Sequence, residues 1–386
     1  MIRKYLFRCI LLLVVFFGGT CFLVLPVRAE ETSQAVTMPS EYFSLLETLP
    51  KELFELLPDG LLSSDGEEVG AAVAEMSDFS YLLRTVLELV GLRLGDCLRI
   101  LATVAGLLLL VSVVRAIQSS LRNAQLSRAF SFCSTLIVIL VLSSAGYGCF
   151  AAVTEYFNNL LTLTRSAIPL LASLYVTGGN VTAAVTSTSG LSIFLTVMEE
   201  IVGRSILPFC GLCLALAMIG ALDSGVRIHT LSGTLKKNYT TLLAFLMMLL
   251  VAMLASQTVL AAKGDTLTMK SAKFAISNMI PVVGGSISEL LRTLSAGVGY
   301  LRGSVGICGI LLLLLLLLPT LAELFLLRLT WQICASLADL LGCDTEKRLL
   351  EEFASVLGYL IAAVAICSAI PTFSFVLVMH CASALV

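Results

Sequence analysis

Long apolar runs restrict this chain to a helical membrane fold. A transmembrane helix needs about 17–25 predominantly apolar residues, and six runs meet that requirement: Leu98–Val114, Phe132–Val153, Ser205–Leu222, Thr240–Ala262, Val305–Leu327 and Val356–Val378. Charged residues make up only 13% of the chain, which is about half of their share in soluble globular domains. We therefore predict an all-α, polytopic bundle of transmembrane helices, with a membrane domain over residues 98–386.

The first residues have the organisation of a secretory signal peptide. Three basic residues precede the apolar stretch Cys9–Leu25, which Val27-Arg28-Ala29 follows as a cleavage site. We predict that residues 1–29 are a signal peptide, cleaved after Ala29. An uncleaved anchor is the alternative, and under either interpretation residues 30 to about 96 lie outside the cytoplasm.

The exported segment, residues 30–97, is acidic and is expected to be helical. Fourteen Asp or Glu residues lie between Glu30 and Arg99, which disfavours nucleic acid or anionic lipid as a partner of this segment. Apolar residues recur at spacings of three and four from Tyr42 to Leu57, which predicts short amphipathic helices. A second such pattern, from Phe79 to Leu94, predicts a helix that lies along the outer membrane surface or packs on a neighbouring subunit.

Two stretches between the spans combine a proline with a glycine pair. They are Thr154–Arg204, with Ile168-Pro169 and Gly178-Gly179, and Lys263–Ser304, with Ile280-Pro281 and Gly284-Gly285. Backbone freed by Pro or Gly is tolerated at membrane depth only where it is buried in protein or lines a wet cavity. We therefore predict interrupted or re-entrant segments near residues 160–200 and 274–300.

These two segments supply the candidate functional residues. Asn278 is expected to bond to carbonyl groups that Pro281 leaves without a donor, and the glycines permit positive φ angles or close helix approach. The candidate pore or hinge residues are Asn278, Pro281, Gly284, Gly285, Pro169, Gly178 and Gly179. A Pro-kinked helix hairpin with only a packing role is the alternative.

The order of these features repeats along the chain. A span, a basic loop, a second span, an Ile-Pro pair and a Gly-Gly pair occur twice, about 110 residues apart. This order predicts a degenerate tandem repeat in parallel orientation. A parallel repeat requires both interrupted segments to lie on the exported side or to re-enter from it.

The charges of the loops predict which side each loop faces. Arg115, Arg122 and Arg128 follow the first span, and Arg227, Lys236 and Lys237 follow the third. The positive-inside rule places both loops in the cytoplasm. Five bases between Lys263 and Arg302 oppose this topology, because that stretch is placed outside. An extra crossing at Val181–Val197 is the alternative, and it would move the C-terminus to the cytoplasm.

Little in the sequence is suited to catalysis. There is no Gly-Lys pair, hence no GxxxxGK phosphate loop, no HExxH motif, and only two histidines. Cys210 and Cys213 have CxxC spacing, but their apolar surroundings favour a packing role. We expect neither an enzyme nor a bound metal or cofactor.

Glu323 is the candidate intramembrane acid. It follows Pro319 near the end of the leucine-rich run, and an acid at such depth is a functional candidate, with a proton or cation route as the specific hypothesis. The alternative is an interfacial acid that pairs with a base such as Arg328.

Residues 230–310 resemble a known family. The segments concerned are Leu231–Lys237, Ala255-Ser256-Gln257, Lys270–Phe274 and especially Ser277–Glu289. They resemble the stage III sporulation protein AE family of endospore-forming bacteria. Met279 and Glu289 depart from the family pattern, in which an aromatic residue and an Asp are expected.

The resemblance implies a mother-cell protein of the outer forespore membrane, in the channel complex that links mother cell and forespore after engulfment. The implied partners are the lipid bilayer, the other membrane proteins of the stage III A complex, including a secretion-type ATPase and ring-forming proteins, and a forespore membrane protein across the intermembrane space, but no nucleic acid. On this interpretation the chain is an export-apparatus or permease-like core. A stand-alone secondary transporter of a small solute and a structural scaffold for ring assembly are the alternatives.

Overall fold

The fold is a bundle of long helices, seen in a computed structural model that describes residues 37–54, 57–119, 124–201, 205–222, 228–279 and 284–380. Its helices are α2 (Ser40–Glu47), α3 (Lys51–Phe54), the 3-10 helix η1 (Asp59–Leu62), α4 (Gly66–Met76), α5 (Phe79–Ser119), α6 (Ala124–Thr177), α7 (Val181–Ile201), α8 (Leu207–Leu222), α9 (Ile228–Met279), α10 (Gly284–Leu340) and α11 (Asp344–His380). The predicted all-α class is confirmed. The signal peptide predicted at residues 1–29 lies outside the described residues.

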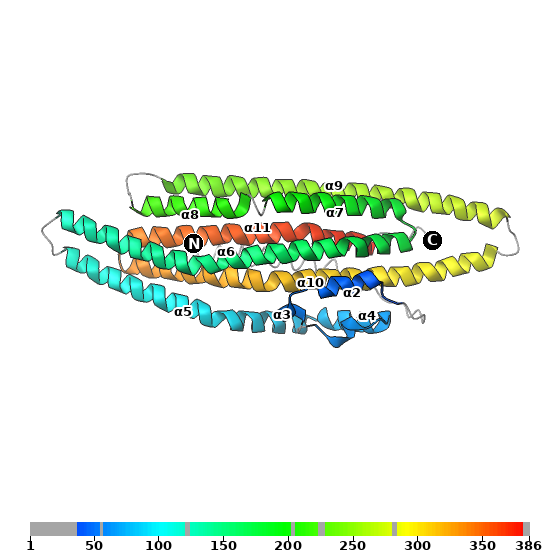
Figure 1. Ribbon diagram of the computed structural model, residues 1–386, viewed down its shortest axis with the longest axis horizontal. Coiled ribbons are helices and arrows are strands. Elements are labelled where there is room, and N and C mark those ends of the chain that lie inside the picture. The colour runs from blue at the N-terminus through cyan, green and yellow to red at the C-terminus, as the bar shows by residue number, and fades with distance from the viewer. Residues whose placement is uncertain are drawn as a thin grey trace.

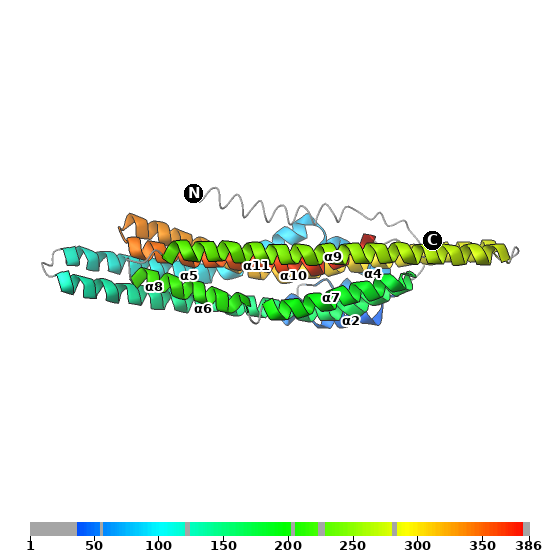
Figure 2. The same ribbon diagram turned by 90° about the horizontal axis from the view of Figure 1, so that it is seen from above.

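The long helices run back and forth along one axis (Figures 1 and 2). Helices α5, α8 and α10 end, and helices α6, α9 and α11 begin, at one end of the bundle, which we call the basic end. Helices α6 and α9 end, and helices α7 and α10 begin, toward the other, which we call the glycine end. Helices α7 and α8 lie end to end and together make one pass. Residues 181–200 are long and apolar enough to cross a membrane, yet they do not reverse the direction of the helices that follow.

The helices are much longer than a bilayer is thick. Helices α6, α9 and α10 contain 54, 52 and 57 residues, which corresponds to roughly 80 Å at about 1.5 Å per residue. The hydrocarbon core of a bilayer is only about 30 Å thick. A large part of each of these helices must therefore lie outside the hydrocarbon.

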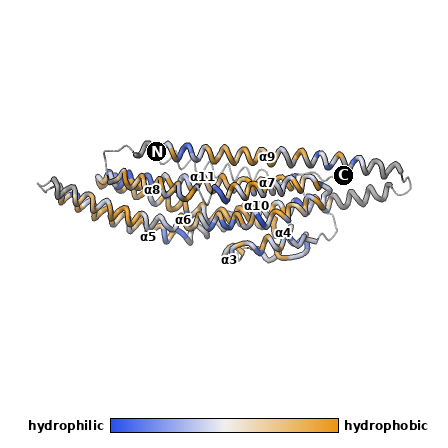
Figure 3. Tube along the Cα trace, turned by 45° about the horizontal axis from the view of Figure 1, so that its top comes forward, coloured by the Kyte–Doolittle hydropathy of each residue, from blue (hydrophilic) through white to orange (hydrophobic). Residues whose placement is uncertain are grey.

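Exposed apolar side chains mark a lipid-facing part of the bundle. Leu110 of α5, Leu140 of α6 and Phe245 of α9 are 65%, 68% and 65% exposed, and hydrophobic residues follow one another along α5 and α9 in Figure 3. Six helices of the described chain are long and apolar enough to cross a membrane. The chain is therefore a multi-pass membrane protein.

Helix α10 forms the centre of the bundle. The leucine run Leu311–Leu318 is almost entirely buried, and Trp331 is 1% exposed. Helices α5, α6 and α11 pack around α10 (Figure 1). The run that was predicted as one of six similar spans is thus an internal helix, which explains its lack of polar residues on any face.

The proline of the first interrupted segment does not interrupt its helix. Helix α6 continues through Pro169 to Thr177, so the interruption predicted near residues 160–200 does not lie at Pro169. A proline costs one backbone hydrogen bond, and a helix that is held by neighbouring helices can tolerate that loss. The chain turns instead at Gly178-Gly179.

In the second segment, α9 ends at Met279 and α10 begins at Gly284. Pro281 lies outside the described residues, as do the side chains around Asn278, Gly284 and Gly285. Each half of the predicted repeat therefore contains one helix of more than 50 residues, α6 with 54 and α9 with 52, that ends near a glycine pair.

The segment that was predicted to be exported forms a small helical unit against α6 and α10, which we call the exported unit after that prediction. Helix α2 buries Tyr42, Leu45 and Leu46, which confirms the amphipathic prediction. The Tyr42 hydroxyl donates a hydrogen bond to the Leu61 carbonyl at 3.2 Å and lies 3.6 Å from Cys308 Sγ of α10. Burial, and then the neighbouring Cys308, raise the pKa of Tyr42, so the hydroxyl stays a neutral donor.

Residues 79–94 do not form a separate surface helix. They are continuous with the first membrane span in α5, which runs unbroken from Phe79 to Ser119. The boundary predicted between residues 97 and 98 therefore falls inside one helix.

Candidate functional site

The turn after α6 is the best-defined of the predicted sites. Gly179 has φ 78°, a left-handed conformation that glycine adopts without strain. Its N–H donates to the Val176 carbonyl at 2.9 Å, and the Asn180 N–H donates to the Tyr175 carbonyl at 2.9 Å. These bonds satisfy carbonyl groups at the C-terminus of α6.

A buried arginine of α10 binds this turn. Arg302 is 2% exposed. Its Nε donates to the Leu174 carbonyl at 3.1 Å, and its Nη2 donates to the Tyr175 carbonyl at 3.3 Å and to Asn180 Oδ1 at 3.4 Å. The C-terminus of a helix carries partial negative charge, which compensates the buried guanidinium.

Gly178 provides the space for this arginine. A Cβ atom at Gly178 would overlap the Arg302 guanidinium. On the other side of the turn, Asp265 of α9 accepts a hydrogen bond from the Ala183 N–H at 3.0 Å, near the start of α7. Carboxylates are favoured at helix N-termini, so α9 and α10 together hold the turn between α6 and α7.

The predicted pore or hinge residues do not form one cluster. Gly178 and Gly179 lie in the turn, whereas Pro169 lies on an exposed part of α6, more than two helical turns away. The end of α9 and the start of α10, at Gly284, lie beyond the α6–α7 turn along the axis of the bundle (Figure 1). The two Gly-Gly pairs are therefore at different heights.

Glu323 is paired, as one of the two interpretations expected, but with another base. Its Oε2 lies 3.4 Å from Arg93 Nη2 of α5, and the two side chains are 21% and 48% exposed. Arg328 instead lies beside Gly358 of α11. The pair connects α5 to α10 at a partly exposed position.

A more deeply buried ion pair connects α9 to α11. Lys236 Nζ lies 2.5 Å from Glu352 Oε2 and 3.0 Å from Ser355 Oγ. The charged side chains are 7% and 8% exposed. The sequence places Lys236 in a basic loop, and its partner is 116 residues away, so no local pattern indicates this pair.

A second buried acid lies at the basic end. Glu346 is fully buried at the start of α11, and its Oε2 lies 2.5 Å from Arg115 Nη2 of α5. Arg115 also donates to the Gly342 carbonyl at 2.9 Å in the α10–α11 connection. This base, assigned to a cytoplasmic loop, therefore holds two helix ends together.

The described residues contain no group of three or more His, Cys, Asp or Glu that could hold a metal ion. Cys210 and Cys213 are both buried in α8. Their placement agrees with the packing role that their apolar surroundings favour.

Comparisons with known proteins connect this architecture to one family. A model of the family described as stage III sporulation protein AE matches residues 71–384. Among curated proteins, the stage III sporulation protein AE of Bacillus subtilis (strain 168) is 22% identical over 271 residues, which cover 70% of this chain and 68% of the relative. No solved structure matches. The family match includes every candidate residue described above.

Proposed function

This chain belongs to the stage III sporulation protein AE family, and from that premise we propose that it is a membrane component of the channel complex between mother cell and forespore. Family membership gives it a role in sporulation. In the proposal, the chain is an export-apparatus or permease-like core in the outer forespore membrane, and forespore development after engulfment depends on it.

The length of the helices is the observation that carries this proposal. Helices of 52–57 residues are roughly 80 Å long at about 1.5 Å per residue, so a membrane-embedded bundle projects well beyond one face of the bilayer. A component that connects two membranes needs such a projection, whereas a simple permease does not. The glycine end and the docked exported unit would face the space between the membranes.

The charge distribution supports two kinds of partner. The basic end, with Lys237 exposed at the start of α9, would face the mother-cell cytoplasm, where a secretion-type ATPase is proposed to dock. The exported unit exposes acidic residues, among them Glu67, Glu68 and Glu75 of α4. Ring-forming proteins and a forespore membrane protein are the proposed partners there, and complementary charge would favour basic surfaces on them.

A stand-alone secondary transporter is the second candidate, and one observation favours it. The Lys236–Glu352 pair is buried among membrane-spanning helices, where ionisable residues often belong to ion or proton routes. This candidate predicts solute uptake by liposomes that contain only this chain. A structural scaffold, the third candidate, predicts that the glycine pairs tolerate substitution but that the exported unit cannot be deleted.

Late forespore-specific gene expression after engulfment tests the proposal. We expect an in-frame deletion of the gene to abolish this expression, and a wild-type copy to restore it. A Gly284→Leu, Gly285→Leu variant, made at the wild-type level, is expected to fail if the glycine segment is part of the channel. Normal expression in the deletion strain would contradict the proposed role.

A further inference from the structure

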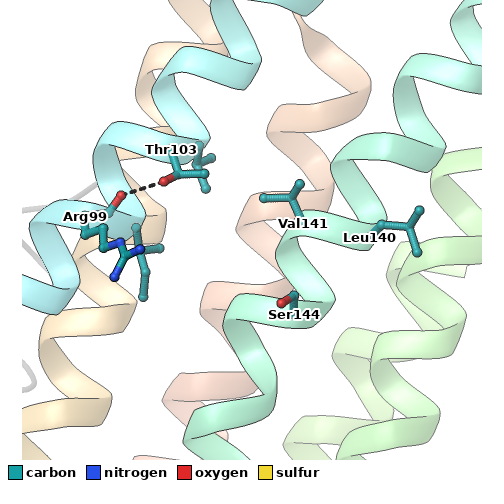
Figure 4. A pocket seen from close by; sticks show the side chains of 7 residues that line it. Arg99, Thr103, Leu140, Val141 and Ser144 are labelled. Carbon is teal, nitrogen blue, oxygen red and sulfur yellow. Dashed lines mark hydrogen bonds between the residues drawn. The ribbon is translucent and has the colours of Figure 1, made fainter.

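A groove opens between α5 and α6 in the membrane part of the bundle (Figure 4). Arg99, Ile100, Thr103 and Val104 of α5 line it together with residues of α6, and its volume is about 450 Å³. This volume lies within the range of about 300–1,000 Å³ that is usual for small-molecule sites. The groove is therefore large enough to hold part of an elongated ligand.

The groove is lined by both polar and apolar side chains. In Figure 4, the Arg99 side chain lies near the level of Leu140 and Val141, with Thr103 further along α5 in one direction and Ser144 further along α6 in the other. The Thr103 hydroxyl is already used, because it donates to the Arg99 carbonyl at 2.8 Å. Apart from Arg99 and Ser144, the lining thus offers mainly aliphatic contacts, as an acyl chain requires.

The guanidinium of Arg99 has no acidic partner among the described residues. Other arginines of these helices do have one: Arg93 pairs with Glu323, and Arg115 pairs with Glu346. A guanidinium beside an apolar groove is well suited to a phosphate, which it can bind through two parallel hydrogen bonds.

Asp96 adds a second charge next to Arg99 on α5, beside the residues that line the groove. It lies three residues before Arg99 on α5, and residues at that spacing are neighbours on a helix surface. Asp96 is exposed, and no described base forms an ion pair with it. An exposed base and an exposed acid side by side complement a headgroup that carries both a phosphate and an amine.

We propose that this groove binds a phospholipid with an amine headgroup, such as phosphatidylethanolamine. Arg99 binds the phosphate, Asp96 binds the ammonium group, and one acyl chain lies along Ile100, Val104 and Val141. Because residues 30–97 are expected outside the cytoplasm, the headgroup lies in the outer leaflet. A net anionic lipid is disfavoured by the acids near this level, Asp96, Glu155 and Glu323.

Native mass spectrometry of the full chain in detergent, titrated with dioleoyl phosphatidylethanolamine or dioleoyl phosphatidylglycerol, tests the site. The wild type should bind phosphatidylethanolamine more tightly. Arg99→Gln should weaken binding of both lipids by about fivefold, the effect of one base near a lipid phosphate. Asp96→Asn should weaken only phosphatidylethanolamine, and Val141→Trp, which fills the groove, should abolish both.

Two matched variants serve as controls. Arg84→Gln removes an exposed arginine of α5 outside the groove, and Leu110→Trp adds a ring to the exposed face of α5; both should bind as the wild type does. Unchanged binding in Arg99→Gln and Val141→Trp would overturn the site. Equal affinity for the two lipids would overturn the role of Asp96. A dimer that Val141→Trp dissociates would show that a helix of a second copy fills the groove.

Discussion

Single glycines and single charges determine how the helix ends of this bundle fit together. At the α6–α7 turn, Gly179 provides the positive φ angle and Gly178 provides space for Arg302. A buried arginine would be costly if it had no partner, and here the carbonyl groups of Leu174 and Tyr175 accept its hydrogen bonds. The turn is therefore a packing site as much as a connection.

Gly178→Leu should destabilise the protein. The new side chain would have to occupy the position of the Arg302 guanidinium, and overpacking of this kind costs about 1–3 kcal/mol. Thermal unfolding in detergent measures the loss. Gly299→Leu is the control, because no atom lies within 4 Å of a Cβ atom at Gly299 of the same helix as Arg302. Equal losses in the two variants would contradict the assigned role of Gly178.

The sequence predicted that Gly178 and Gly179 matter, but it did not predict which residues contact the turn that they form. The glycine pair at 178–179 stands out locally, because glycine next to glycine after an apolar run is a turn signal. Arg302 and Asp265 come from α10 and α9, and no local pattern connects residues so distant in sequence. The predicted topology placed Arg302 in an external stretch and gave it no partner.

Helix pairs in the bundle are joined by ion pairs of very different burial. Lys236 and Glu352 connect α9 to α11 with side chains only 7% and 8% exposed. Lys347 and Asp339 join the end of α10 to the start of α11 with side chains 31% and 56% exposed. The two residues of a buried pair depend on each other strongly, because removal of one leaves an uncompensated buried charge. Exposed pairs contribute little to the stability of the folded protein.

Lys236→Met and Glu352→Leu should each destabilise the α9–α11 contact by about 3–5 kcal/mol, the cost of an unpaired buried charge. The double variant should recover most of that loss, because two apolar side chains can replace a buried pair. Unfolding of the four proteins in detergent gives the double-mutant cycle. Asp339→Asn should leave stability unchanged. Single variants as stable as the wild type would contradict the burial of this pair.

Hydropathy predicted where the membrane helices lie in the sequence, but not how long they are. Apolar runs identified the membrane helices, and the spacing of Tyr42, Leu45 and Leu46 identified α2. Their lengths were not predicted, because hydropathy alone ended the second span at Val153. Beyond it, apolar residues recur at spacings of three and four and are buried in α6: Tyr156, Leu160, Leu163, Ala167 and Leu170. Pro169 shows that a local signal can mislead, because α6 continues through it and the neighbouring Leu170 and Leu171 are buried in the bundle.

The whole molecule is a column whose length exceeds the bilayer. Only part of its roughly 80 Å fits within a hydrocarbon core of about 30 Å, and the exported unit packs on α10 at Tyr42 and Tyr300. The positive-inside rule applies only near the ends of membrane segments. Lys263 and Lys270 lie near the end of the span that ends at Ser256, so they still oppose an external position. Arg302 does not, because it is buried against the α6–α7 turn.

Cysteine labelling with a membrane-impermeant maleimide, in intact non-sporulating cells that carry the protein in their cytoplasmic membrane, tests this arrangement most directly. In a Cys133→Ala background, single cysteines would replace Lys270 in the projecting part, Leu110 in the lipid-facing part and Lys237 at the basic end, all exposed side chains. Lys270→Cys should be labelled from outside, Lys237→Cys only after permeabilisation, and Leu110→Cys in neither case. Labelling of Lys237→Cys from outside, with Lys270→Cys protected until permeabilisation, would contradict an exported column.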